Sequence, residues 1–174
     1  MSVATSGLHD FVEPAIAASP LDPGNLVAAF FGVKDFYTST CFFRSSRDGG
    51  ATWAPGGTIA TRFPDDLCDD ATRTDQFFPW IAAHPSGFIS LVWLDKRLDP
   101  DNVNFDLFYI NTGGGQRFLP NVRISTQSSL GSHAHFIGDY NGLVVSGDAI
   151  VPVWNDARDA SGVEIFTARG NLVP

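Results

Sequence analysis

Short apolar runs separated by polar turns occur along the whole chain. The runs are rich in Val, Ile, Phe and Trp, as in residues 81–83 (IAA), 91–93 (LVW) and 107–109 (LFY). Clusters of Gly, Pro, Asn and Asp stand between them. Runs of this length and composition, bounded by turn residues, are typical of β-strands. The pattern therefore predicts an all-β chain without long helices.

The same order of segments recurs along the sequence. The aligned pairs are residues 13–20 with 78–85, 58–61 with 123–126, and 91–97 with 152–158. Each repeat is interpreted as four short strands, A to D, and the small apolar strand A is expected to be buried on both faces. Four antiparallel strands repeated every 40–65 residues are typical of a β-propeller blade, and stacking of blades covers their apolar faces.

Residues 46–53, SRDGGATW, predict a tight turn. The Asp48 carboxylate can accept hydrogen bonds from nearby backbone N–H groups, and Gly49 and Gly50 tolerate positive φ. Apolar residues flank the turn, with CFF (41–43) before it and Trp53 at its end. This arrangement is typical of a β-hairpin.

This stretch resembles the Asp box, Ser-x-Asp-x-Gly-x-Thr-Trp, of the sialidase-like BNR-repeat propellers; the matching residues are Ser46, Asp48, Gly50, Thr52 and Trp53. Residues 13–30 and 138–158 also resemble this superfamily, and the second repeat has Gly113 at the position of the Asp. The resemblance implies a sialidase-like β-propeller in which the Asp box forms the C–D hairpin and its aromatic residue packs between strands. We therefore interpret the five residues as structural.

About three four-stranded blades are expected, at residues 8–61, 74–127 and 136–174, with a strand at 2–5 completing the last blade. Closed propellers have about 4–8 blades. Two copies of the chain would make a six-bladed ring, the blade number that the resemblance implies. We therefore predict a homodimer; the alternative is that the chain is part of a longer propeller.

The ligand face is expected opposite the Asp box, at the ends of strands B and in the D–A loops. The resemblance implies a ligand site on that face. The candidate ligand-binding residues there are Asp95, Arg97, Asp156, Arg158, His133, His135 and Asp139. Each Asp-x-Arg pair could instead be a structural salt bridge that ties neighbouring blades, rather than a guanidinium that recognises an anion or sugar hydroxyls.

Sialidase chemistry needs an arginine cluster, a Tyr activated by a Glu, and an acidic residue. The Phe/Tyr-Arg-Ile-Pro signature that the resemblance implies is absent, and neither of the two glutamates, Glu13 and Glu164, has an evident tyrosine partner. Asp139 with Tyr140 is the candidate catalytic pair. The leading function is a glycan-binding module, and the alternatives are a structural fragment or a divergent glycoside hydrolase that acts through Asp139, Tyr140, Asp95 or Asp156.

The length, charge and cysteine content of the chain limit the partners and cofactors that it is expected to bind. The chain has 174 residues, enough for one domain with a core, and a net charge of −8 without a basic cluster, which argues against nucleic acid and anionic membranes. No targeting segment is evident, whereas the resemblance suggests a secreted parent. No cofactor is predicted, although the run Asp65, Asp66, Asp69 and Asp70 could bind Ca²⁺ instead of being a solvated loop. Cys41 and Cys68 leave one disulfide or two free thiols as alternatives.

Overall fold

A computed structural model describes residues 10–34, 38–54, 74–113, 117–134, 136–159 and 162–172. Several predicted features lie outside these residues: the strands at 2–5 and 58–61, the acidic run at 65–70, Cys68 and His135. Cys41 is buried in β3, and the alternative of a disulfide or two thiols stays open because Cys68 lies outside the described residues. None of the described segments is a helix with the length and apolar character needed to cross a membrane.

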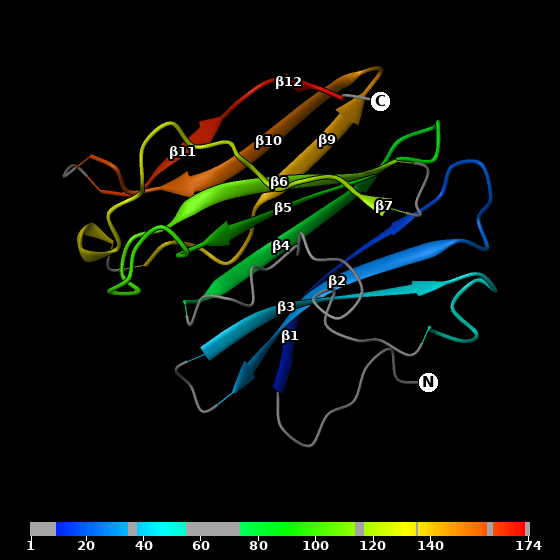
Figure 1. The fold of residues 1–174 in the computed structure, drawn as a ribbon, viewed down its shortest axis with the longest axis horizontal. Helices are drawn as coiled ribbons and strands as arrows, with labels where there is room; N and C mark the ends of the chain where they lie inside the picture. The colour runs from blue at the N-terminus through cyan, green and yellow to red at the C-terminus, as the bar shows by residue number, and fades with distance from the viewer. Residues whose placement is uncertain are drawn as a thin grey trace.

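The described residues form three antiparallel sheets that lie side by side in chain order (Figure 1). The first sheet contains β1 (Asp10–Ala18), β2 (Leu26–Lys34) and β3 (Thr38–Ser46). The second contains β4 (Gln76–Ala83), β5 (Ile89–Asp95), β6 (Asp106–Gly113), β7 (Arg117–Phe118) and β8 (Val122–Arg123). The third contains β9 (Gly142–Ser146), β10 (Ala149–Asp156), β11 (Glu164–Thr167) and β12 (Gly170–Asn171).

The architecture is part of a β-propeller, and the predicted all-β fold is confirmed. Each sheet is one blade whose strands run up and down in chain order from the inner strand, β1, β4 or β9. These inner strands are neighbours, with β4 between β1 and β9. The blade boundaries proposed from the sequence stay a prediction.

One core runs through all three blades, and β5 lies at its centre. Trp93 and its neighbours on β5 are almost completely buried, because β5 is the second strand of the middle blade and has a blade on each side. The expectation that every strand A is buried on both faces is wrong for β1 and β9, where Ile16 and Val144 are exposed. Each of these strands belongs to an outer blade, and among the described residues only one of its faces meets another blade.

The turn at residues 46–53 is closed by its own side chains. Asp48 Oδ1 accepts hydrogen bonds from the Ser46 hydroxyl at 2.8 Å and from the Thr52 backbone N–H at 2.7 Å, while Asp48 Oδ2 accepts one from the Thr52 hydroxyl at 2.5 Å. The indole of Trp53 packs against a small cluster formed by Ala28, Phe30 and Phe42. These contacts are compatible with a structural role for the five residues; that role and their assignment to the sialidase-like family stay predictions.

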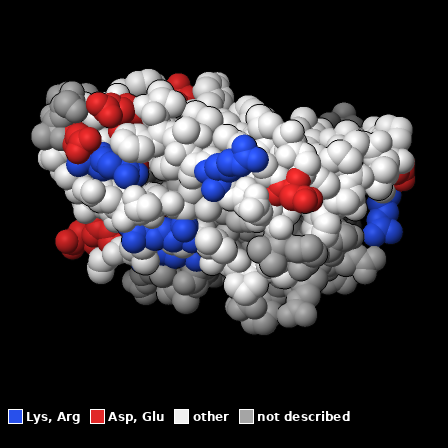
Figure 2. All heavy atoms as spheres, turned by 90° about the horizontal axis from the view of Figure 1, so that it is seen from above, with Lys and Arg blue, Asp and Glu red and all other residues white. Residues whose placement is uncertain are grey.

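Charged side chains are dispersed on the face drawn in Figure 2. Lys and Arg groups lie apart there among uncharged residues, with Asp and Glu groups between them. That face of the described chain therefore offers no continuous basic surface.

The turn predicts a pH-dependent stability. Hydrogen bonds from the Thr52 hydroxyl and backbone, and from Ser46, lower the pKa of Asp48 to about 2 from an ordinary value of 3.8. A carboxylate with a lowered folded-state pKa stabilises the fold above pH about 4, and this contribution is lost as the pH falls towards 2. We expect Asp48→Asn to be less stable than the wild type at pH 6 and nearly equal to it at pH 2, measured by urea unfolding.

Trp53→Ala is the control for this measurement, because it removes packing rather than charge. Trp53→Ala should lower the free energy of unfolding by about 2–4 kcal/mol, and this loss should change little with pH. Replacing a fully buried Trp by Ala costs about 3–5 kcal/mol, and the loss is smaller here because Trp53 is partly exposed. A stability deficit of Asp48→Asn that is the same at pH 6 and pH 2 would contradict the assignment.

Candidate functional site

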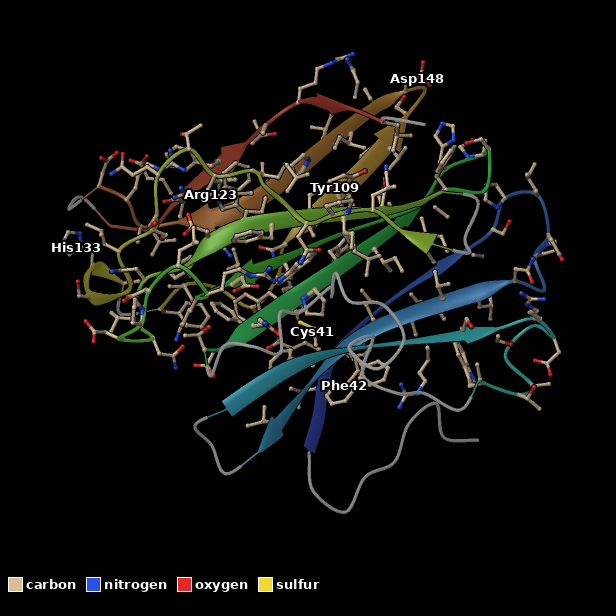
Figure 3. The ribbon with its side chains drawn as sticks, in the orientation of Figure 1. Cys41, Phe42, Tyr109, Arg123, His133 and Asp148 are labelled. Carbon is tan, nitrogen blue, oxygen red and sulfur yellow. The ribbon has the colours of Figure 1, made fainter. Side chains whose placement is uncertain are left out.

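The blades have two ends with different chemistry. We call the end at which β1, β4 and β9 begin the entry face, and the opposite end, which carries the 46–53 turn, the turn face. Figure 3 shows His133, in the segment before β9, and Asp148, in the β9–β10 turn, at opposite ends of the sheets. The entry face is the face on which the sequence predicts a ligand site.

Two equivalent residues on the entry face have an unusual backbone conformation. Glu13 in β1 and Phe78 in β4 are 65 positions apart in the aligned repeats and have φ values of 52° and 53°. Each lies in a β-bulge, between Val12 and Ala15 or between Phe77 and Trp80, and each precedes a proline. Residues other than Gly rarely adopt such angles, and bulges of this kind re-aim side chains beside functional sites.

The two bulges meet the segment before β9 in a narrow pocket, which we call the entry-face pocket. It is lined by Glu13, Pro14, Phe78, Pro79, Trp80, Asp139, Tyr140 and Asn141. The Asn141 side-chain amide donates a hydrogen bond to the Phe78 carbonyl at 2.7 Å, and the Asn155 amide donates one to the Tyr140 carbonyl at 3.2 Å. The segment at 139–141 is therefore held on both β4 and β10, and all three blades contribute to the pocket.

The carboxyl group of Glu13 has a raised pKa in this pocket. Burial, and then repulsion by the charge of Asp139, raise the pKa of Glu13 to about 7 from an ordinary value of 4.5. Its Oε2 is buried and has no hydrogen-bond partner among the described residues, and the same is true of Asn141 Oδ1. Buried acceptors are normally paired, so these two oxygens can accept donors from a ligand. A carboxyl group that titrates near neutral pH can also transfer a proton.

The predicted pair Asp139 and Tyr140 does lie in this pocket, and both side chains are exposed. Sequence reasoning missed Glu13 as their neighbour. A usable signal was present in the repeat alignment, because Glu13-Pro14 replaces Phe78-Pro79 and one of only two glutamates therefore falls at an inner-strand bulge.

The Asp-x-Arg pairs on the same face form salt bridges within their own blades, although Arg158 Nε is buried without a hydrogen-bond partner among the described residues. Arg97 binds Asp95 through Nη2 at 2.6 Å and Nε at 2.8 Å, and the Trp93 indole N–H donates to the same carboxylate at 2.8 Å. The guanidinium lies 4.5 Å from the ring centroid of Phe108. Asp95 is fully buried. This geometry favours a structural salt bridge, whose contacts lie mainly within one blade. A ligand-binding role of Asp95 and Arg97 stays a prediction.

The third blade repeats this arrangement. Arg158 Nη2 binds Asp156 at 2.6 Å, the Trp154 indole N–H donates to Asp156 at 3.0 Å, and the guanidinium lies 4.1 Å from the Phe166 centroid. The hydrogen bond to Asp156 raises the pKa of Arg158. Arg158 also donates to Thr126 in the preceding repeat at 3.4 Å, so this pair makes one contact with the neighbouring blade.

His133 is exposed in a short 3₁₀ turn, Gly131–His133, and does not line the entry-face pocket. The described residues contain no group of three His, Cys, Asp or Glu side chains arranged to hold a metal ion.

A larger cavity of about 620 Å³ lies on the turn face between the first two blades. Three of its polar side chains bond within the protein: Asp22 accepts a hydrogen bond from the Gly24 N–H, Ser19 accepts from the Leu21 N–H, and His84 Nε2 bonds the Gly147 carbonyl in the third blade. The entry-face pocket has a volume of only about 10 Å³, room for about one water molecule, so a larger ligand would lie over its opening. It is nevertheless the candidate site, because it contains the unpaired acceptors and the perturbed acid.

Comparisons with known proteins support the fold. No family profile and no curated protein matches the sequence. Among solved structures, the chain is similar to an α-L-arabinofuranosidase of family GH93 from Fusarium graminearum in complex with arabinobiose, with a TM-score of 0.62 and 11% identity. It is also similar to an α-L-arabinanase of Penicillium chrysogenum complexed with arabinobiose, with a TM-score of 0.60 and 16% identity.

A third similar structure is the E242A mutant of the Fusarium graminearum arabinofuranosidase with an iminosugar inhibitor, with a TM-score of 0.59 and 11% identity. The three matches cover 91–92% of this chain but only 45–46% of the other chains. The chain therefore spans less than half the length of these enzymes, and the likeness establishes the fold alone.

The pocket predicts a measurable titration. We expect the Glu13 carboxyl carbon to titrate near pH 7 in a ¹³C NMR experiment, with the signal assigned by its loss in Glu13→Gln. Asp139→Asn should lower the pKa of Glu13, because it removes the repulsion, but not to 4.5, because burial remains.

The same shift has a consequence for stability. A carboxyl group with a raised folded-state pKa makes the free energy of unfolding fall as the pH rises from about 4.5 to about 7. Glu13→Gln should lack this decline. A Glu13 carboxyl that titrates at its ordinary value in the folded protein would show that the pocket does not perturb it.

Proposed function

We propose that the entry-face pocket and the surface around its opening form part of a glycoside hydrolase site, with the sugar lying over the opening. The observation that carries the proposal is Glu13, an acid with a pKa near neutrality and an unpaired oxygen, beside the carboxylate of Asp139. Glycoside hydrolysis commonly uses two carboxyl groups, one kept protonated by its environment and one ionised. The similarity to arabinan-degrading enzymes fits this class of reaction.

Each residue has a distinct role in the proposed reaction. The protonated Glu13 gives its proton to the glycosidic oxygen as the bond between that oxygen and the anomeric carbon breaks. Asp139 accepts a proton from the water molecule whose oxygen bonds to the anomeric carbon. Asn141 Oδ1 accepts a hydrogen bond from a sugar hydroxyl, and the rings of Trp80 and Tyr140 give the sugar an apolar surface.

The lining of the pocket favours a neutral sugar. It holds two carboxyl groups, those of Glu13 and Asp139, and the described lining contains no Lys or Arg. The two nearby arginines of the Asp-x-Arg pairs are bound to their own carboxylates. An acidic sugar such as sialic acid needs cationic partners, so a hydroxyl-rich neutral sugar, such as the arabinobiose bound by the similar enzymes, suits the pocket better than a sialidase substrate.

A glycan-binding module without hydrolysis is the second candidate. The exposure of Asp139 and Tyr140 favours it, because an accessible pocket can bind sugar without enclosing a reaction.

We expect the chain to release 4-nitrophenol from 4-nitrophenyl α-L-arabinofuranoside and not to cleave a fluorogenic sialoside. Glu13→Gln should lower kcat by about 10²–10⁴-fold, the usual contribution of a positioned acid, with a small change in KM. Asp139→Asn should also lower kcat. The matched control is Glu164→Gln, because Glu164 is the only other glutamate and is exposed on β11.

Isothermal titration calorimetry with arabinobiose distinguishes a glycoside hydrolase from a glycan-binding module. Binding that Asn141→Ala weakens, without turnover of the aryl arabinoside, would support the binding module and reject hydrolysis. Neither binding nor turnover, or full activity of Glu13→Gln, would reject the assignment of this pocket.

A further inference from the structure

A second pocket, which we call the Lys96 pocket, opens on the entry face. It has a volume of about 420 Å³, within the range of roughly 300–1,000 Å³ that is usual for small-molecule sites. Asp75 lies just before β4 and Lys96 just after β5, so the pocket is at the end of the sheets that His133 marks in Figure 3. Its polar lining residues are Asp75 and Lys96, and the apolar ones include Phe77, Phe105, Phe136 and Ile137.

The Lys96 pocket and the entry-face pocket are built on the same two segments of the chain. On β4, Phe77 lines the Lys96 pocket and the next residue, Phe78, lines the entry-face pocket. In the segment before β9, Ile137 lines the Lys96 pocket and Asp139 lines the entry-face pocket. The two pockets are therefore neighbours on one surface, and a ligand that covers the opening of the smaller one can extend into the larger one.

The lining of the Lys96 pocket combines apolar rings with a balanced charge pair. Phe77 and Phe105 are buried, and their ring centroids lie 5.7 Å apart. Lys96 Nζ lies 3.2 Å from Asp75 Oδ2 and 5.6 Å from the centroid of the Phe77 ring. An ammonium group has three N–H donors, and the hydrogen bond to Asp75 uses one of them. The described lining thus has no excess charge and retains donors for a hydroxyl-rich ligand.

Two exposed aromatic rings lie along this surface, one at each pocket. Phe136 lines the Lys96 pocket and is 67% exposed, and Tyr140 lines the entry-face pocket and is 68% exposed. Among the described side chains, these are the two exposed aromatic residues. Four residues of chain span at most about 14 Å, so a short oligosaccharide can contact both rings. Exposed apolar groups beside a few polar groups commonly mark ligand-binding grooves.

We propose that the Lys96 pocket binds further units of a neutral oligosaccharide whose reacting unit lies over the entry-face pocket. This inference rests on the proposed function, because it takes the sugar at the entry-face pocket as its starting point. That pocket has a volume of only about 10 Å³, so the rest of the ligand lies on the neighbouring surface. There Phe136 packs against a sugar ring, and Lys96 donates a hydrogen bond to a sugar hydroxyl. The ligand is then a chain of several units rather than a single sugar.

Isothermal titration calorimetry with arabinobiose and with arabinotetraose tests the second pocket. Arabinotetraose should bind the wild type about tenfold more tightly, a difference of about 1.4 kcal/mol, because the longer chain reaches the Lys96 pocket. Phe136→Ala should remove most of this advantage and should still fold, since the side chain is mostly exposed. Ile165→Ala is the matched control, because Ile165 is 69% exposed on β11 and lines neither pocket; it should keep the full advantage.

The possible results separate the Lys96 pocket from the proposed function. Equal affinity of the wild type for the two sugars, or an advantage that survives in Phe136→Ala, overturns the Lys96 pocket and leaves the proposed function in place. Arabinotetraose binding that Phe136→Ala weakens and Asn141→Ala leaves unchanged would retain sugar binding at the Lys96 pocket and overturn the proposed function of the entry-face pocket. Failure of both sugars to bind overturns both.

Discussion

The packing of one blade face on the next is the constraint on which the rest of the structure depends. A four-stranded sheet of these short strands has two apolar faces and cannot cover both alone. In this chain the middle blade is covered on both sides, and its strand β5 is almost fully buried from Ser90 to Asp95. The outer blades are each covered on one side among the described residues. The two outer blades differ on their other sides: Ala28, Phe30 and Phe42 of the first blade are buried with Trp53, whereas Val144, Val153 and Ile165 of the third blade are exposed.

Blade packing also creates the conditions for chemistry. It brings the beginnings of β1 and β4 beside the segment that precedes β9, although these lie more than 60 residues apart in the chain. Glu13 and Phe78 lie in β-bulges, and both residues line the entry-face pocket between the blades. Burial there, together with the nearby charge of Asp139, raises the pKa of Glu13. By contrast, the carboxylates of Asp95 and Asp156 are neutralised by arginines within their own blades and consolidate the strand ends.

Much of the architecture could be predicted from sequence because the repeats preserve apolar alternation and turn chemistry. The antiparallel strands and the closure of the turn around Asp48 follow from local residue types, and Asp139 and Tyr140 lie at the end of the blades where the sequence placed them. Glu13 could not be placed in this way, because its environment depends on a bulge and on residues from two other blades. The expected double burial of strand A was wrong for β1 and β9, since burial of an inner strand depends on its neighbours rather than on its own composition.

The central claim is that ligand chemistry belongs to the entry face, where the perturbed acid lies, and not to the larger cavity beside the 46–53 turn. The most direct measurement is an NMR titration of the ¹⁵N-labelled chain with arabinobiose. The account predicts shifts of the Trp80 indole N–H and of the Asp139 and Asn141 backbone amides, with those of Asp22 and Arg47 unchanged. Shifts confined to Asp22, Arg47 and their neighbours in the larger cavity would contradict it.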